Sequence, residues 1–162
     1  MDPYHETYQG NPEPLPEINE VPVARLMQLE KQHYDGANWF YWIAGLSALS
    51  SILIVIGSPI VSAISLGSTQ FLVAIGQQIP ELTIAAVIAG VLIVGVFALL
   101  GYLSNKGKRG AYIIGIILFF LDTLIVLWAQ DYIGFAFHCL ALYFMIVGAI
   151  ALFKLKKLAP QH

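Results

Sequence analysis

Charged side chains are scarce in this chain of 162 residues: Asp, Glu, Lys and Arg together make up 11%, while hydrophobic residues make up 58%. Soluble domains carry about 25% charged residues. A core surrounded by water could not enclose so much apolar surface, so the composition predicts a multi-pass membrane protein without a separate soluble catalytic domain. The formal net charge of −2 shows no excess of basic residues of the kind that binds nucleic acid.

Cysteine is almost absent as well, and Cys139, the one that occurs, falls inside a predicted span. A single thiol excludes a disulfide within the chain, a redox dithiol and a cysteine-based zinc site. His138 is the only histidine inside a predicted span, which excludes bis-histidine haem ligation within one chain. We therefore expect no metal and no cofactor. The first 20 residues contain no apolar run, so we expect the first transmembrane helix to act as its own insertion signal.

The N-terminal part of the chain is polar. Residues 1–19 form an acidic, proline-rich segment without a basic residue, which we expect to be a cytoplasmic tail too polar to fold alone. Residues 20–35 place apolar side chains on one helical face and basic or amide side chains on the other. This pattern predicts an amphipathic helix in the membrane interface, broken at Asp35-Gly36.

The transmembrane domain is expected over residues 36–158, followed by a short C-terminal tail, 159–162. It contains stretches of about 20 mostly apolar residues, the length that crosses ~30 Å of hydrocarbon. They predict spans over residues 38–57, 81–103, 110–129 and 134–153. The predicted fold class is an all-α integral membrane four-helix bundle with an N-terminal interfacial helix and an extra membrane-associated segment between the first and second spans.

Basic residues set the predicted orientation. One cluster follows the second span and another follows the fourth, and the hairpin between them returns to the side that it left. These residues are Lys106, Lys108 and Arg109, and Lys154, Lys156 and Lys157. We interpret them as lipid-headgroup or topology residues that face the cytoplasm, in the inner or plasma membrane.

Segment 58–79 decides the number of spans. It is long enough to cross, but Ser58, Ser62, Ser65 and Thr69 form a polar stripe along it, and Gly67-Ser68 interrupts it. If it does not cross, all 8 Lys and Arg residues lie inside; if it does, the chain has five spans and an external N-terminus. The positive-inside rule favours four spans, cytoplasmic N- and C-termini, and a re-entrant or interfacial 58–79.

Two ionisable residues interrupt the last two spans, Asp122 in the third and His138 in the fourth. In an antiparallel hairpin they fall at nearly one depth. Each lies on a helical face dominated by small residues that we expect to face the interior: Ala111, Gly115, Asp122 and Ala129 in the third span, and Gly134, His138, Ala141, Met145 and Gly148 in the fourth. A charged group inside the bilayer costs ~2.5–3.5 kcal/mol on insertion scales, so the two side chains should be paired or neutral. We expect them to hydrogen-bond to each other, with Ser50 and Ser51 of the first span completing a polar cluster.

Two functional interpretations follow from this pair. If it fixes the register of the hairpin, the chain is a non-enzymatic structural or accessory subunit that packs against other membrane subunits or copies of itself in the lipid bilayer. If it handles a proton or cation, the chain is a small transporter or channel. A membrane enzyme or cofactor carrier assembled between copies is a third alternative. Sequence favours the first.

Overall fold

The computed structural model describes residues 22–55 and 66–158, which are helical almost throughout and contain no strand. Its elements are α1 (Val23–Val55), α2 (Gly67–Gln78), the 3-10 turn η2 (Pro80–Leu82), α3 (Thr83–Asn105), α4 (Arg109–Trp128) and α5 (Tyr132–Leu158). The predicted tails 1–19 and 159–162 and the first part of segment 58–79 lie outside the described residues. The predicted all-α fold class is confirmed.

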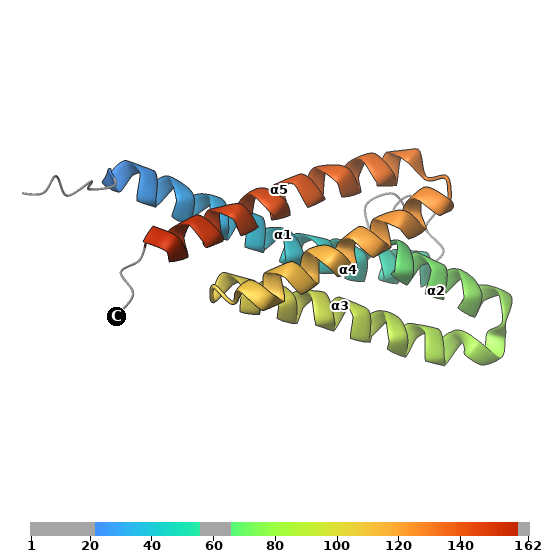
Figure 1. Ribbon diagram of the computed structural model, residues 1–162. Coiled ribbons are helices and arrows are strands. Elements are labelled where there is room, and N and C mark those ends of the chain that lie inside the picture. Colours follow the sequence, from blue (N-terminus) through green and yellow to red (C-terminus); the bar gives the residue numbers. More distant parts are fainter. Residues whose placement is uncertain (1–21, 56–65, 159–162) are drawn as a thin grey trace, which may run out of the picture.

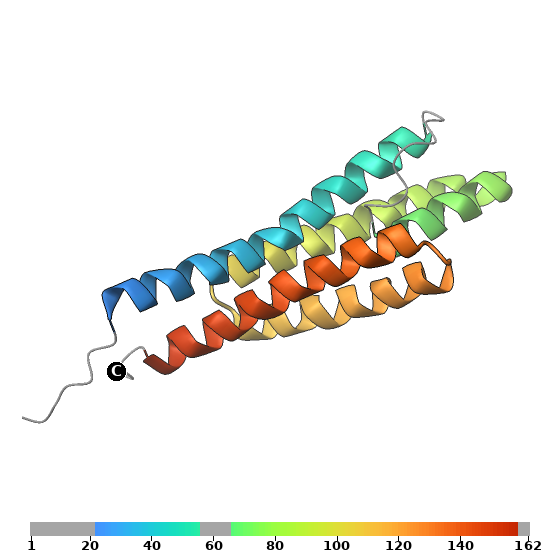
Figure 2. The same ribbon diagram turned by 90° about the horizontal axis from the view of Figure 1, so that it is seen from above.

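The long helices α1, α3, α4 and α5 lie side by side, each antiparallel to the next, and the shorter α2 lies at one end of them (Figure 1, Figure 2). α1 packs along α5 and α3, α4 packs against α5 and α3, and α2 lies mainly on α3. The start of α1, the α3–α4 turn and the end of α5 share one end of the molecule. We call it the basic end, because it carries residues 106–109 and 154–157. At the opposite end, the α2–α3 turn projects beyond the α4–α5 turn.

Three of the described helices are long and apolar enough to cross a membrane: Pro80–Asn105, Arg109–Trp128 and Tyr132–Leu158. They correspond to the spans predicted over 81–103, 110–129 and 134–153. α1, which contains residues 38–55 of the span predicted over 38–57, is not among them. The structure therefore supports a membrane protein with three candidate spans, and the fourth crossing remains a prediction.

The helix break predicted at Asp35-Gly36 is wrong, because α1 runs without interruption from Val23 to Val55. Gly36 instead permits a close helix contact. A Cβ built on it would lie 2.7 Å from the Cα of Gly148 and 2.8 Å from the carbonyl oxygen of Phe144, both on α5. The predicted interfacial helix is thus the first part of α1, and it buries Leu29 and His33 against the rest of the molecule.

The core forms where the predicted small-residue faces meet. On α5, all five residues assigned to the interior face are buried: Gly134, His138, Ala141, Met145 and Gly148. On α4, Ala111, Gly115 and Asp122 are buried as predicted, but Ala129 is exposed because α4 ends one residue before it. Phe40 of α1 fills the space above Gly115 and is fully buried.

Candidate functional site

Asp122 on α4 and His138 on α5 meet inside the molecule, with His138 Nε2 3.2 Å from Asp122 Oδ2. Their side chains are only 4% and 1% exposed. The contact follows from the sequence, since both residues lie on the small-residue faces where two antiparallel helices pack closely.

The His138 ring is held by two further contacts. Its Nδ1 lies 2.8 Å from the carbonyl oxygen of Gly134, one turn earlier on α5. Its face stacks on the Phe119 ring at a centroid distance of 4.9 Å and an interplanar angle of 8°. Since a carbonyl oxygen can only accept, Nδ1 must carry the proton and donate it to Gly134.

This tautomer has a consequence for Asp122. A neutral imidazole protonated at Nδ1 presents a lone pair at Nε2, and that lone pair would face the lone pairs of Asp122 Oδ2. The contact is attractive only when one more proton lies between the two atoms, either on the imidazole or on the carboxyl. In both arrangements the pair has zero net charge, which suits an environment of low dielectric.

The carboxylate of Asp122 also holds the start of α2, which the sequence did not predict. Gly67 N–H donates to Asp122 Oδ2 and Ser68 N–H donates to Asp122 Oδ1, both at 2.8 Å. The residue before α2, Leu66, provides no side-chain cap. Asp122 therefore caps α2 from another helix, and its carboxyl oxygens lie at the positive end of the α2 dipole. We call Asp122, His138 and these two amides the Asp122 cluster.

A glycine at the start of α2 makes this approach possible. A Cβ built on Gly67 would lie 2.6 Å from Cγ2 of Val126 and 3.4 Å from the carbonyl oxygen of Asp122. Any larger residue would push α2 away from α4. The interruption predicted at Gly67-Ser68 is instead the start of a helix, because α2 begins at Gly67.

Serines of α1 extend the polar contacts to a third helix. Ser47 Oγ, which is fully buried, accepts the N–H of Leu66 at 2.8 Å, and Ser51 Oγ donates to the carbonyl oxygen of Ser47 at 2.8 Å. Ser50 is also buried. Ser47 thus holds the residue before α2. It was not among the predicted site residues, because no local pattern links it to Leu66, 19 residues further along the chain.

The six basic candidates lie away from the Asp122 cluster, at the basic end. Lys106 Nζ lies 4.4 Å from the centroid of the Tyr102 ring, and the Arg109 guanidinium carbon lies 5.2 Å from that of Phe153. The other four are exposed at the same end: Lys108, Lys154, Lys156 and Lys157. α4 starts at Arg109, so its basic start and Asp122 are separated by ~20 Å of helix.

No protein-family model, curated protein or solved structure matches this chain. Within residues 22–55 and 66–158, no group of three or more His, Cys, Asp or Glu side chains could hold a metal ion.

A cavity of about 370 Å³ borders the Asp122 cluster between α3 and α4. Among the described residues that line it, Asp122 and Ser68 are polar. The remaining lining is aliphatic or aromatic: Leu92, Ile93, Val96, Phe97, Leu118, Leu121 and Ile125. On this side the Asp122 cluster is therefore bordered by apolar side chains. Such surroundings suit a buried, hydrogen-bonded contact between helices.

Proposed function

We propose that this protein is a non-enzymatic integral membrane protein that crosses the bilayer four times and packs, as a structural or accessory subunit, against other membrane segments. The fourth crossing would be α1, whose 33 residues extend ~50 Å and lie along α3 and α5. A helix beside two spanning helices over such a length would share their membrane environment.

The Asp122 cluster supports a structural role, because its groups satisfy one another. Both carboxylate oxygens accept backbone amides of α2, and one of them also meets His138. Leaving any of these buried groups unpaired would cost about 1–3 kcal/mol. The cluster therefore fixes a short helix, α2, against α4 and α5, and no reacting atom needs to be invoked.

The observation that carries the subunit proposal is a groove of small and aliphatic side chains between α1, α2 and α3. It has a volume of about 360 Å³. We call it the α1–α3 groove, and its lining residues are Ala48, Ser51, Ile52, Val73, Ala86, Val87, Gly90, Val91 and Val94. Small residues at helix surfaces let a partner backbone approach closely in lipid, which is how transmembrane helices associate. Ala86, Gly90 and Val94 recur at steps of four along α3, so they share one face.

Gly90 and Gly95 give a matched test of this proposal. A Cβ built on either residue meets nothing within 4 Å, so the two positions offer the same room for the first atom of a larger side chain. Only Gly90 lines the α1–α3 groove. We expect Gly90→Leu to weaken association roughly tenfold, as overpacking of a close contact does, and Gly95→Leu to leave it unchanged. The measurement is recovery of other membrane subunits, or of a second differently tagged copy, with the full chain purified in mild detergent. Equal recovery from both variants would contradict the proposal.

A second candidate, a small proton- or cation-conducting protein, is favoured by the extra proton that the Asp122–His138 contact requires. Asp122→Asn and His138→Ala separate the two candidates. In a conducting protein both changes abolish flux into vesicles while expression stays normal. In a packing subunit both reduce thermal stability and leave association at the α1–α3 groove intact.

A further inference from the structure

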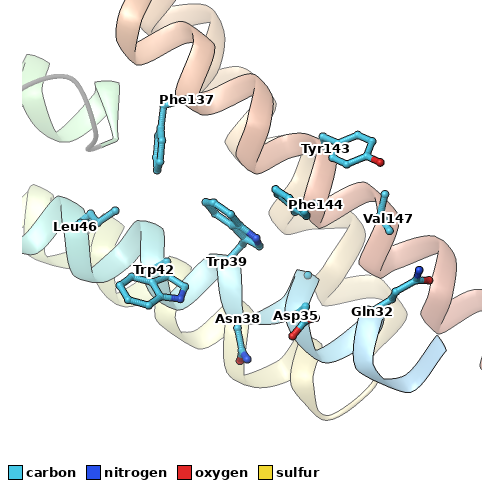
Figure 3. A pocket seen from close by; sticks show the side chains of 11 residues that line it. Gln32, Asp35, Asn38, Trp39, Trp42, Leu46, Phe137, Tyr143, Phe144 and Val147 are labelled. Atoms are coloured by element: carbon cyan, nitrogen blue, oxygen red, sulfur yellow. The ribbon is translucent and has the colours of Figure 1, made fainter. Parts of the chain in front are cut away.

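A second groove, lined by neither Asp122 nor His138, runs between α1 and α5 and has a volume of about 690 Å³ (Figure 3). We call it the α1–α5 groove. Its walls are Gln32, Asp35, Gly36, Asn38, Trp39, Trp42 and Leu46 of α1, and Phe137, Tyr143, Phe144 and Val147 of α5. It combines one carboxylate, two amides and five aromatic rings, a composition unlike that of the α1–α3 groove.

The chemistry of the α1–α5 groove changes along its length. Gln32, Asp35 and Asn38 lie toward one end, while Leu46 and Phe137 lie toward the other (Figure 3). Asn38 Oδ1 accepts a hydrogen bond of 3.2 Å from Asn105 Nδ2, and Asn105 is the last residue of α3. The polar end of the groove therefore lies at the level where α3 ends, beside the turn that carries Lys106. A phospholipid has its polar headgroup at the membrane surface and its acyl chains deeper in the bilayer. The groove matches this arrangement, with polar residues at the end of a span and apolar residues further inside.

The charge of the groove indicates which kind of lipid headgroup would fit it. No Lys or Arg lines it, and Asp35 forms no ion pair with any residue in the described ranges 22–55 and 66–158. A carboxylate at this position repels an anionic headgroup and attracts an ammonium group. The amide oxygen of Gln32 is a further acceptor beside it. Several acceptors suit a primary ammonium, which has three N–H donors, better than a trimethylammonium, which has none.

The tryptophans provide the complementary donors. Trp39 stacks on Phe144 at a centroid distance of 5.3 Å and an interplanar angle of 7°, which fixes its ring between the two helices. Trp42 is 65% exposed, so its ring is open to the surroundings. An indole N–H is a donor only, and tryptophans at the membrane interface commonly direct it toward headgroup oxygens. Both rings can therefore bind phosphate or ester oxygens.

We propose that the α1–α5 groove binds a phospholipid with a primary ammonium headgroup, that is, phosphatidylethanolamine. The ammonium lies at Asp35 and Gln32, the phosphate and ester oxygens lie at the indole N–H groups of Trp39 and Trp42, and one acyl chain lies over Leu46 and Phe137. This proposal requires a membrane location but not a partner subunit, so it can be tested separately from the proposed subunit function.

The tryptophans also provide the probe. The chain has 3 Trp residues, and Trp128 is 78% exposed at the far end of α4. In the Trp128→Phe variant all tryptophan fluorescence therefore comes from the groove. The full-length variant is placed in vesicles containing equal mole fractions of brominated phosphatidylethanolamine, phosphatidylglycerol or phosphatidylcholine, and quenching by each lipid gives its relative association constant.

We expect phosphatidylethanolamine to associate roughly two- to fivefold more strongly than phosphatidylglycerol, the range of an exposed charge pair, and more strongly than phosphatidylcholine. Asp35→Asn should bring the ethanolamine-to-glycerol ratio to about 1. Glu30→Gln removes an exposed carboxylate of the same helix that does not line the groove, and should leave the ratio unchanged.

Four results would overturn the proposal. They are equal quenching by the three lipids, a lipid preference that survives Asp35→Asn, stronger association of phosphatidylcholine than of phosphatidylethanolamine, and the absence of quenching by any lipid. The last result would show that something other than lipid covers the groove.

Discussion

Gly36 of α1 and Gly148 of α5 lie face to face, so that a Cβ built on Gly148 would come within 2.7 Å of the Cα of Gly36. The same Cβ would also overlap the hydroxyl of Tyr112, which is buried against both helices and donates to the carbonyl oxygen of His33 at 3.4 Å. The first part of α1 is therefore joined to α5 by a contact in which neither helix has room for a methyl group.

This contact predicts a stability effect at Gly148. Gly148→Ala should lower stability by about 1–3 kcal/mol, because the backbones of α1 and α5 must separate to admit the methyl group. The measurement is thermal unfolding in mild detergent. Gly45→Ala is the control, since a Cβ there meets nothing within 4 Å, and it should be neutral or stabilise α1 by about 0.5–1 kcal/mol. Similar midpoints for the two variants would show that α1 and α5 do not pack closely at this level.

The Asp122 cluster predicts a selective effect of Asp122→Asn. The asparagine oxygen can still accept Ser68 N–H, and its NH₂ group can donate to Nε2 of a neutral His138. Gly67 N–H, however, then faces an NH₂ group and loses its acceptor. We expect a loss of about 1–3 kcal/mol and faster hydrogen exchange at the first amides of α2.

Asp131→Asn is the matched control for that experiment. Asp131 Oδ1 accepts Gly134 N–H at 2.9 Å in the α4–α5 turn, so it caps α5 rather than α2. Its replacement should leave exchange at Gly67 unchanged. If Asp122→Asn had no effect on exchange in α2, the cap between α4 and α2 would not contribute to holding that helix.

His33 predicts a pH dependence of stability at the basic end, outside the predicted spans. Its side chain is 4% exposed, and burial lowers its pKa below the usual 6.5. A hydrogen bond to the backbone of Asn105 and the charge of Glu30 oppose this shift, while Lys156 of α5 adds to it. Tyr112 of α4 also faces the ring, at a centroid distance of 5.8 Å.

The sign follows from proton binding. Between the lowered pKa of the folded state and 6.5, the unfolded chain binds more protons at this histidine than the folded chain does. Stability contributed by neutral His33 is therefore complete above about pH 6.5 and declines as the pH falls below it. Thermal midpoints between about pH 7.5 and about 5.5 should show this decline, and His33→Gln should reduce it. An equally steep decline in the variant would assign it to another group.

The four-span topology predicts a labelling pattern. In a Cys139→Ser background, single cysteines at Met27, Glu81 and Lys157 test the start of α1, the start of the second predicted span and the end of α5. We expect Met27→Cys and Lys157→Cys to react with an impermeant maleimide from one side of the membrane, and Glu81→Cys from the other. If Met27→Cys reacted together with Glu81→Cys, the four-span topology would be wrong, either because α1 does not cross or because segment 58–79 crosses as well.

The contact between Asp122 and His138 could be inferred from the sequence because it depends on local periodicity. The small-residue faces of α4 and α5 repeat at helical spacing, and a short turn forces antiparallel packing at a fixed register. The role of Asp122 as the cap of α2 could not be inferred in the same way. Gly67 and Asp122 are 55 residues apart in the chain, and no periodic pattern links them.

The sequence by itself determined an all-α chain with apolar spans, because composition and hydropathy are local properties of each segment. Three of the four predicted spans correspond to described helices that are apolar enough to cross a membrane. Only the tertiary structure decided the structural roles of two glycines, Gly36 and Gly67. The sequence predicted a helix interruption at both Gly36 and Gly67. In the structure Gly36 permits a close contact between helices, and Gly67 begins α2. Glycine allows either outcome because it lacks a Cβ, and what lies opposite decides between them.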